Sequence, residues 1–292
     1  MRRQLTALAG VGALSLSACT IGDPLNEPTE TIDVTTVTET RPPSAESERP
    51  SHESPAPEPT GMDITDSLNA AVDSVIAAYG GQAAVSIVGE QEFSAGDASG
   101  FASWSTMKVP VAIAALKSHP EMKAEASSAI QVSDNGAADL LWNSTTPEEV
   151  EAVLAEGDSP VTVERTVTRP GFSSFGQTQW SVSEQARFAS HLGCVTGAAP
   201  VLDLMSNIAA GQAYGLGTVP GARFKGGWGP SISGAYEVRQ LGLVPDAGGR
   251  SIAIAIAASA ADGTYESGQA MLTQLVTELT PALNDAPEAV CQ

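Results

Sequence analysis

The order of predicted helices and strands between residues 62 and 292 limits the possible folds more than any other feature of this sequence. One amphipathic helix comes first: Asp66 can cap it, Leu68 and Val72 lie on its apolar face, and Gly80 ends it. The other predicted elements are strands at 83–88 and 92–94, helices at 107–116, 121–130, 136–142, 147–155, 183–192 and 200–208, strands at 222–226, 235–243 and 251–258, and a helix at 265–279. This order predicts an α/β protein whose sheet is built from both ends of the region, around an insertion made of helices.

The N-terminus has the pattern of an export signal. Met1-Arg2-Arg3 is basic, residues 5–16 form a short apolar run, and Leu16-Ser17-Ala18-Cys19 follows. The run is too short for a stable membrane span and is typical of a cleaved signal peptide. Its last four residues resemble a bacterial lipobox, which predicts that residues 1–18 are removed and that the thiol of Cys19 is lipidated. We therefore expect an exported lipoprotein on the outer face of the bacterial cell membrane.

Residues 19–61 differ in composition from the rest of the chain. Pro, Thr, Ser and Glu dominate, so we expect a disordered tether, followed by one folded domain over 62–292. The formal net charge of the whole chain is −20, which would repel a polyanion and argues against a nucleic-acid partner. With three His residues and no HExxH or Cys-x-x-Cys spacing, the sequence predicts neither a metal site nor another cofactor.

Two cysteines remain if Cys19 is lipidated. Because an exported protein meets an oxidising compartment, Cys194 and Cys291 are candidates for a disulfide. The alternative is two free thiols, one of them close to the C-terminus.

Three short motifs follow one another along the folded region. Ser105-Thr106-Met107-Lys108 lies at the start of a predicted buried helix, Ser133-Asp134-Asn135 in a short loop before another helix, and Lys225-Gly226-Gly227 on a predicted strand. A Ser-x-x-Lys alone is expected roughly once by chance in a chain of this size. Ser-Asp-Asn alone can be a helix cap. Their combination in an exported protein is the informative signal.

The first motif has the chemistry of an activated nucleophile. A serine hydroxyl needs an adjacent base, and residues three apart on a helix share a face, so Lys108 can serve Ser105. The lysine must be neutral to accept a proton, which burial and a second cation, Lys225, would favour. The helix N-terminus would stabilise a developing oxyanion. The alternative is that Ser105 caps the helix and Lys108 is a solvated surface side chain.

With these motifs the sequence resembles the serine β-lactamases and penicillin-binding proteins, and most closely the class A β-lactamases. The similarity covers nearly all of the folded region and is best over 101–109. The resemblance implies an α/β (α+β) fold, with an antiparallel sheet flanked by helices and an all-helical subdomain. It implies that Ser105 is the nucleophile, Lys108 the proton acceptor and Ser133 the shuttle to the leaving nitrogen. It assigns substrate binding to Asn135, Lys225, Gly227 and Trp228, with the oxyanion hole formed by the backbone N–H groups of Ser105 and Trp228.

The sequence departs from the class A pattern in three places. Ser105 and Ser133 are close together along the chain, which implies a reduced helical subdomain. Gly226 stands where the family has Thr or Ser, and the missing hydroxyl should cost one hydrogen bond to a carboxylate, roughly 1.5–3 kcal/mol. The loop that carries the family's deacylation base offers Glu164, but Arg165 beside it favours a surface ion pair instead.

The resulting hypothesis is a serine hydrolase that is acylated on Ser105 by a β-lactam or a D-alanyl-D-alanine-like substrate and then hydrolyses the ester. One alternative is a D,D-peptidase that acts on peptidoglycan stem peptides. The other, which Gly226 and the weak case for Glu164 favour, is a catalytically degenerate lipoprotein that binds envelope ligands without turnover.

Overall fold

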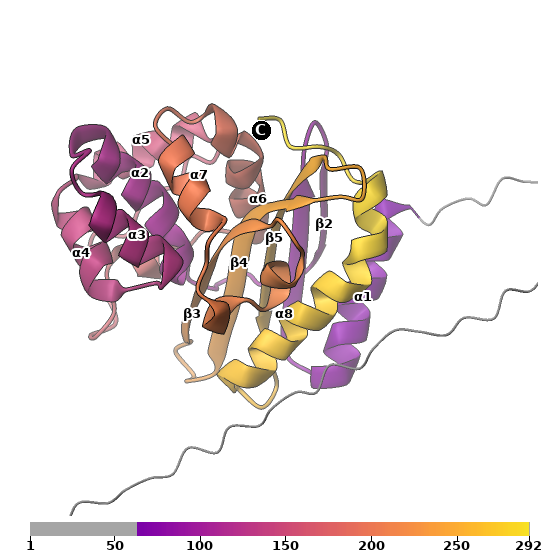
Figure 1. Ribbon diagram of the computed structural model, residues 1–292. Helices are drawn as coiled ribbons and strands as arrows, with labels where there is room; N and C mark the ends of the chain where they lie inside the picture. The colour runs from indigo at the N-terminus through magenta and orange to yellow at the C-terminus, as the bar shows by residue number, and fades with distance from the viewer. Residues whose placement is uncertain (1–62, 292) are drawn as a thin grey trace, which may run out of the picture. The chain divides into compact units, whose positions relative to one another are not determined.

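The computed structural model describes residues 63–291 (Figure 1). The predicted signal peptide, the lipidation site Cys19 and the whole predicted tether lie outside these residues. The described elements, in chain order, are α1 (Ile64–Tyr79), β1 (Gln82–Val88), β2 (Glu92–Gly96), α2 (Lys108–Ser118), α3 (Lys123–Gln131), α4 (Asn135–Asn143), α5 (Pro147–Glu156), α6 (Val182–His191), α7 (Ala199–Met205), β3 (Arg223–Pro230), β4 (Tyr236–Pro245), β5 (Ser251–Ser259) and α8 (Tyr265–Leu279). None of the helices in this part of the chain is long and apolar enough to cross a bilayer.

The five strands form one antiparallel sheet in the order β2-β1-β5-β4-β3. The pairing of β1 with β5, in which Val85 lies opposite Ile256, joins the N-terminal strands to the C-terminal ones. This confirms the prediction of an antiparallel sheet that is built from both ends of the folded region.

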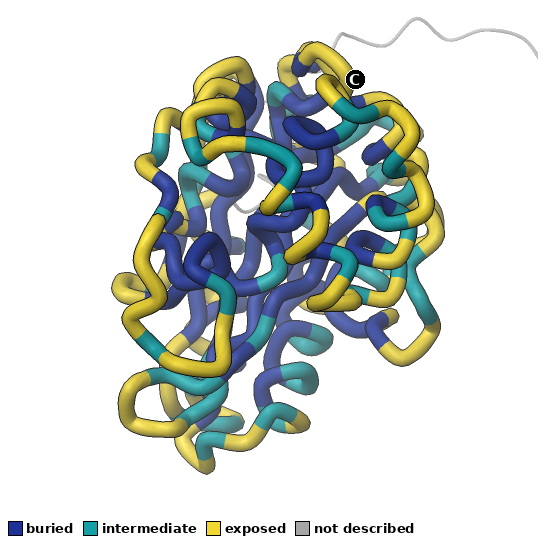
Figure 2. Tube along the Cα trace, turned by 90° about the vertical axis from the view of Figure 1, so that its left-hand side faces the viewer, coloured by how far each residue is buried: buried dark blue, intermediate teal, exposed yellow. Residues whose placement is uncertain are grey.

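The strand β5 shows why the sheet is covered on both faces. Its sequence alternates isoleucine and alanine, and successive side chains of a strand point to opposite faces. Ile254 and Ile256 pack in a core with α1 and α8, whereas Ala255 and Ala257 belong to the core on the opposite face. There the small alanines leave room for α6, which packs against β1 and β5. Figure 2 shows this interior as a continuous buried region.

The helices α2, α3, α4, α5 and α7 form a group beside the sheet (Figure 1). The helix α2 is the centre of this group, because seven of its eleven residues are hydrophobic and buried. Pro110 is accommodated in its first turn, where no intrahelical N–H bond is lost. The helical subdomain expected from the sequence is therefore present, and the motif at residues 105–108 lies where this subdomain meets the sheet.

The structure corrects two predicted boundaries. The N-cap of α1 is Asp63, whose side chain accepts a hydrogen bond from the N–H of Thr65, and Asp66 lies within the first turn. The strand β3 continues beyond its predicted end at Gly226 to Pro230. Its glycines argue against a strand by propensity, but at Gly227 and Gly229 the strand passes so close to residues 104–106 that a side chain would not fit.

Candidate active site

Ser105 lies in a short 3-10 helix, η1 (Trp104–Met107), that leads directly into α2. Trp104, the residue before Ser105 and the first of η1, has φ = 50°, a left-handed conformation that is uncommon for a bulky residue. A buried carboxylate holds this turn: Oε2 of Glu237 accepts hydrogen bonds from Nε1 of Trp104 at 2.9 Å and from the N–H of Ala102 at 3.1 Å. The strand β4 thereby fixes the position from which the Ser105 side chain enters a cavity.

Lys108 is almost completely buried, with 2% of its surface exposed, so it is not the solvated side chain of the alternative interpretation. Its Nζ donates hydrogen bonds to the carbonyl oxygen of Ser133 at 2.7 Å, to Oδ1 of Asn135 at 2.8 Å and to the carbonyl oxygen of Asp134 at 3.2 Å. Burial lowers the pKa of Lys108 to about 8, against the opposing attraction of Asp134 and Asp139. At neutral pH a substantial fraction of this amine is therefore uncharged.

The expected hydrogen bond between Lys108 and Ser105 is not formed. Within residues 63–291 the Ser105 hydroxyl has no hydrogen-bond partner, and Nζ of Lys108 is engaged by the second motif instead. The two residues still share a face, because Lys108 follows Ser105 by one turn. Catalytic hydrogen bonds are often long or poorly aligned before substrate arrives, and the direct contact requires one of the two side chains to move.

Ser133 lies between the two lysines. It has φ = 60°, a left-handed conformation, and the next residue, Asp134, caps α4 by accepting a hydrogen bond from the N–H of Ala137 at 2.6 Å. The Oγ of Ser133 accepts hydrogen bonds from Nζ of Lys225 at 2.9 Å and from Nζ of Lys108 at 3.3 Å. Its hydroxyl proton therefore remains available for donation to a third group.

Lys225 is completely buried on the edge strand β3, where its Nζ also donates to the carbonyl oxygen of Gly226 at 2.8 Å. Burial and the nearby charge of Lys108 hold the pKa of Lys225 well below its usual value. The two amines thus disfavour the doubly charged state, as expected for coupled sites.

Gly227 permits the close approach of β3 to η1. A Cβ at this position would lie 2.8 Å from the backbone N of Ser105 and 2.9 Å from that of Thr106, so no side chain fits. The next residue, Trp228, lines the cavity together with Ser105. The two residues whose backbone N–H groups are expected to form the oxyanion hole therefore both line this cavity.

The cavity in front of these residues has a volume of about 680 Å³. Besides Ser105, Ser133 and Asn135, it is lined by six of the chain's fourteen aromatic residues. These are Trp104, Trp142, Phe172, Phe175, Trp228 and Tyr236. Such a cavity would take an organic molecule with a substantial apolar part.

The loop 157–180 covers one side of the cavity, but Glu164 does not line it. The Oε1 of Glu164 accepts a hydrogen bond from the N–H of Thr166 at 2.8 Å, and Arg165 forms ion pairs with Glu148 and Glu151 on α5. Arg169 fastens the loop to β3: its guanidinium lies 4.5 Å from the ring centroid of Trp104 and donates a hydrogen bond to the carbonyl oxygen of Pro230. The loop is therefore anchored without bringing its glutamate to the cavity.

Sequence reasoning missed two carboxylates of this site. Asp139 lines the cavity, and its signal was its place four residues after Asn135, on the same face of a predicted helix. Glu237 supports the turn at Trp104, and its signal was a pair of charged residues, Glu237 and Arg239, within a predicted strand. Within residues 63–291 no three His, Cys, Asp or Glu side chains gather as a metal site would require.

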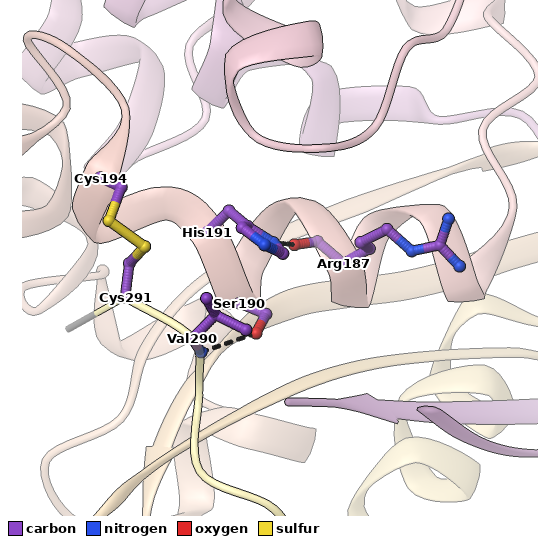
Figure 3. The surroundings of a disulfide bond; sticks show 6 residues. All are labelled: Arg187, Ser190, His191, Cys194, Val290 and Cys291. Atoms are coloured by element: carbon purple, nitrogen blue, oxygen red, sulfur yellow. Dashed lines mark hydrogen bonds between the residues drawn. A yellow bond between two sulfur atoms is a disulfide. The ribbon is translucent and has the colours of Figure 1, made fainter. Parts of the chain in front are cut away.

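The remaining cysteines lie away from the cavity. Cys194 and Cys291 form a disulfide with 5.5 Å between their Cα atoms, which joins the end of α6 to the C-terminal segment (Figure 3). The N–H groups of Val290 and Cys291 donate to Ser190, at 3.0 and 2.8 Å, and hold the same segment. The disulfide, rather than two free thiols, is the state that the structure contains.

Comparisons with known proteins agree with this geometry at the level of the fold. No protein-family model matches the sequence, and no curated protein matches it. Solved structures of class A β-lactamases do match. One from Bacteroides cellulosilyticus has a TM-score of 0.64 and 14% identity, over 77% of this chain and 100% of that one. The TLA-3 extended-spectrum β-lactamase has a TM-score of 0.61 and 14% identity (75% of this chain, 99% of that one), and one from Mycobacterium abscessus a TM-score of 0.60 and 16% identity (76% and 99%). The chain therefore has the fold of these class A β-lactamases.

Proposed function

We propose that this protein is an exported serine hydrolase of the β-lactamase and penicillin-binding type, which forms an ester at Ser105 with a β-lactam or a D-alanyl-D-alanine-like substrate. The observation that carries the proposal is the arrangement of two buried lysines on either side of the Ser133 hydroxyl, next to a cavity that Ser105 enters. Lysines whose pKa is lowered by burial, as in Lys108 and Lys225, cluster at functional sites.

The reaction begins with attack of Ser105 Oγ on the substrate's carbonyl carbon, while neutral Lys108 accepts the hydroxyl proton. The N–H groups of Ser105 and Trp228 stabilise the oxyanion. As the C–N bond breaks, Ser133 donates its proton to the leaving nitrogen and regains one from Lys108, which lies 3.3 Å away. The acyl group then remains bonded to Ser105 Oγ.

Two residues of the motifs hold the substrate in this scheme. A substrate carboxylate beside Lys225 would return that lysine to its charged form, because the new negative charge opposes the effect of burial. Asn135 already keeps Lys108 in place through its Oδ1 at 2.8 Å, and its amide nitrogen is available for a substrate carbonyl.

Anchoring and localisation form part of the same proposal. The signal peptide of residues 1–18, the lipidated Cys19 and the tether to residue 61 would hold the domain at the outer face of the bacterial cell membrane. A disulfide within the domain supports this proposal, because such bonds persist in oxidising compartments.

Covalent labelling tests the proposal. A fluorescent penicillin should label the full chain and increase its intact mass by the mass of the penicillin, whereas Ser105→Ala should give neither result. Equal labelling of both proteins, or no labelling of the natural chain by a β-lactam or a D-alanyl-D-alanine thioester, would refute it. Release of the label within seconds would indicate a β-lactamase, and its persistence for hours a penicillin-binding protein.

A further inference from the structure

We propose that Asp139 is the general base that activates water to hydrolyse the ester at Ser105. The inference rests on the proposed function, because it concerns the second half of that reaction. It assigns turnover to helix α4 rather than to the loop 157–180, where the sequence offered Glu164.

The position of Asp139 on α4 is the first argument. Asn135, Asp139 and Asn143 follow one another at intervals of four residues, so they share one face of the helix, and all three line the cavity. The first of them contacts the amine of Lys108, one helical turn from Ser105. Asp139 therefore lines the same cavity one turn of α4 beyond Asn135, the residue that contacts Lys108.

The state of the Asp139 carboxylate is the second argument. Among the cavity-lining residues of the described chain it is the only acid, and within residues 63–291 it has no hydrogen bond or ion pair. Its side chain is exposed to the cavity and to water, unlike Asp134, which is occupied in capping α4. The carboxylate oxygens are consequently free to accept a proton from water.

The electrostatic relation to Lys108 supports the same assignment. The charge of Asp139 raises the pKa of Lys108 and so opposes the effect of burial. Loss of this charge would lower the pKa of Lys108 further and leave more of it neutral. Removal of the Asp139 charge should therefore not impair acylation, and only hydrolysis should depend on it.

The proposed step conserves atoms and protons. A carboxylate oxygen of Asp139 accepts a proton from water while the water oxygen bonds to the carbonyl carbon of the ester. The tetrahedral intermediate then collapses, the bond between that carbon and Ser105 Oγ breaks, and Oγ takes the proton from Asp139. The product leaves as a carboxylic acid, and the enzyme returns to its starting state.

The decisive experiment compares Asp139→Asn with the matched variant Glu164→Gln in the full chain. Both substitutions remove one negative charge at nearly constant size, and both can preserve the local backbone. A fluorescent penicillin is added, the rate of labelling is recorded, and the loss of label is followed after excess unlabelled penicillin is supplied. Asp139→Glu, which keeps a carboxylate on the same helix position, is the conservative variant.

We expect Asp139→Asn to be labelled at least as fast as the natural protein and to lose its label at least ~100-fold more slowly, since a general base contributes 10²–10⁴-fold. Glu164→Gln should behave like the natural protein, and Asp139→Glu should retain most of the release rate. Three outcomes would overturn the inference while leaving acylation at Ser105 intact. They are release of label from Asp139→Asn at the natural rate, slowed release from Glu164→Gln, and a natural protein that never loses its label. If the natural protein is not labelled at all, the proposed function itself fails.

Discussion

The pKa of Lys108 leads to a prediction about the rate of acylation. With a pKa of about 8, about one-tenth of this amine is neutral at pH 7, whereas a lysine with the ordinary value of 10.5 would be neutral in about one molecule in three thousand. Burial therefore increases the population of the active base roughly 300-fold. If neutral Lys108 is the base, acylation should rise about tenfold per pH unit below pH 8 and level off above it.

Lys108→Arg tests the same reasoning by substitution. A guanidinium can still donate to the oxygens of Ser133 and Asn135, but its pKa lies above 12, so it is almost never neutral. Compared with the one-tenth of Lys108 that is neutral at pH 7, the base population falls by more than about ten-thousand-fold. We expect acylation to fall by at least about a thousandfold.

Rapid-mixing measurements of labelling by a fluorescent penicillin between pH 6 and 9 would give these rates. Thermal unfolding of Lys108→Arg shows whether the larger side chain is accepted at a position that is only 2% exposed. The pH profile of the natural protein does not depend on that outcome. A flat profile over this range, or a folded arginine variant that is acylated within tenfold of the natural rate, would refute the assignment of Lys108 as the base.

Two further substitutions test the packing around the site and the chain end. Replacing both Cys194 and Cys291 by Ser opens a loop with a sequence separation of 97 residues. This should lower the free energy of unfolding by roughly 4–5 kcal/mol and the Tm by roughly 10–15 °C. A Tm shift below about 3 °C in scanning calorimetry would contradict the estimate. Gly227→Ala would place a Cβ 2.8 Å from the backbone N of Ser105, so β3 must move away and acylation should fall about 100-fold, the cost of one oxyanion donor. Gly211→Ala, where a Cβ meets nothing within 4 Å, is the control; equal labelling rates for the two variants would show that the close approach is unimportant.

The sequence by itself determined the architecture and the three motifs that gather at the site, but not the two carboxylates Asp139 and Glu237. The alternation of β5, the order of elements and the three motifs follow from local patterns, and the predicted helix at 265–279 has the same bounds as α8. Local patterns also located most helices to within a few residues, because periodicity and capping act over one or two turns. The end of β3 is an exception: its glycines have low strand propensity, and the proximity of η1 explains why glycine occurs at positions 227 and 229.

Contacts between distant parts of the chain were decided by the tertiary structure alone. Ser105 and Lys108 are close in sequence, but the partners of the lysine amine come from residues 133–135, and the support of the Trp104 turn comes from Glu237 on β4. The loop 157–180 contains a glutamate, yet its anchoring keeps that side chain away from the cavity, whereas Asp139 lies within it. The physical reason is that burial, a lowered pKa and the choice between two carboxylates depend on which surfaces meet, and one-dimensional spacing does not specify that.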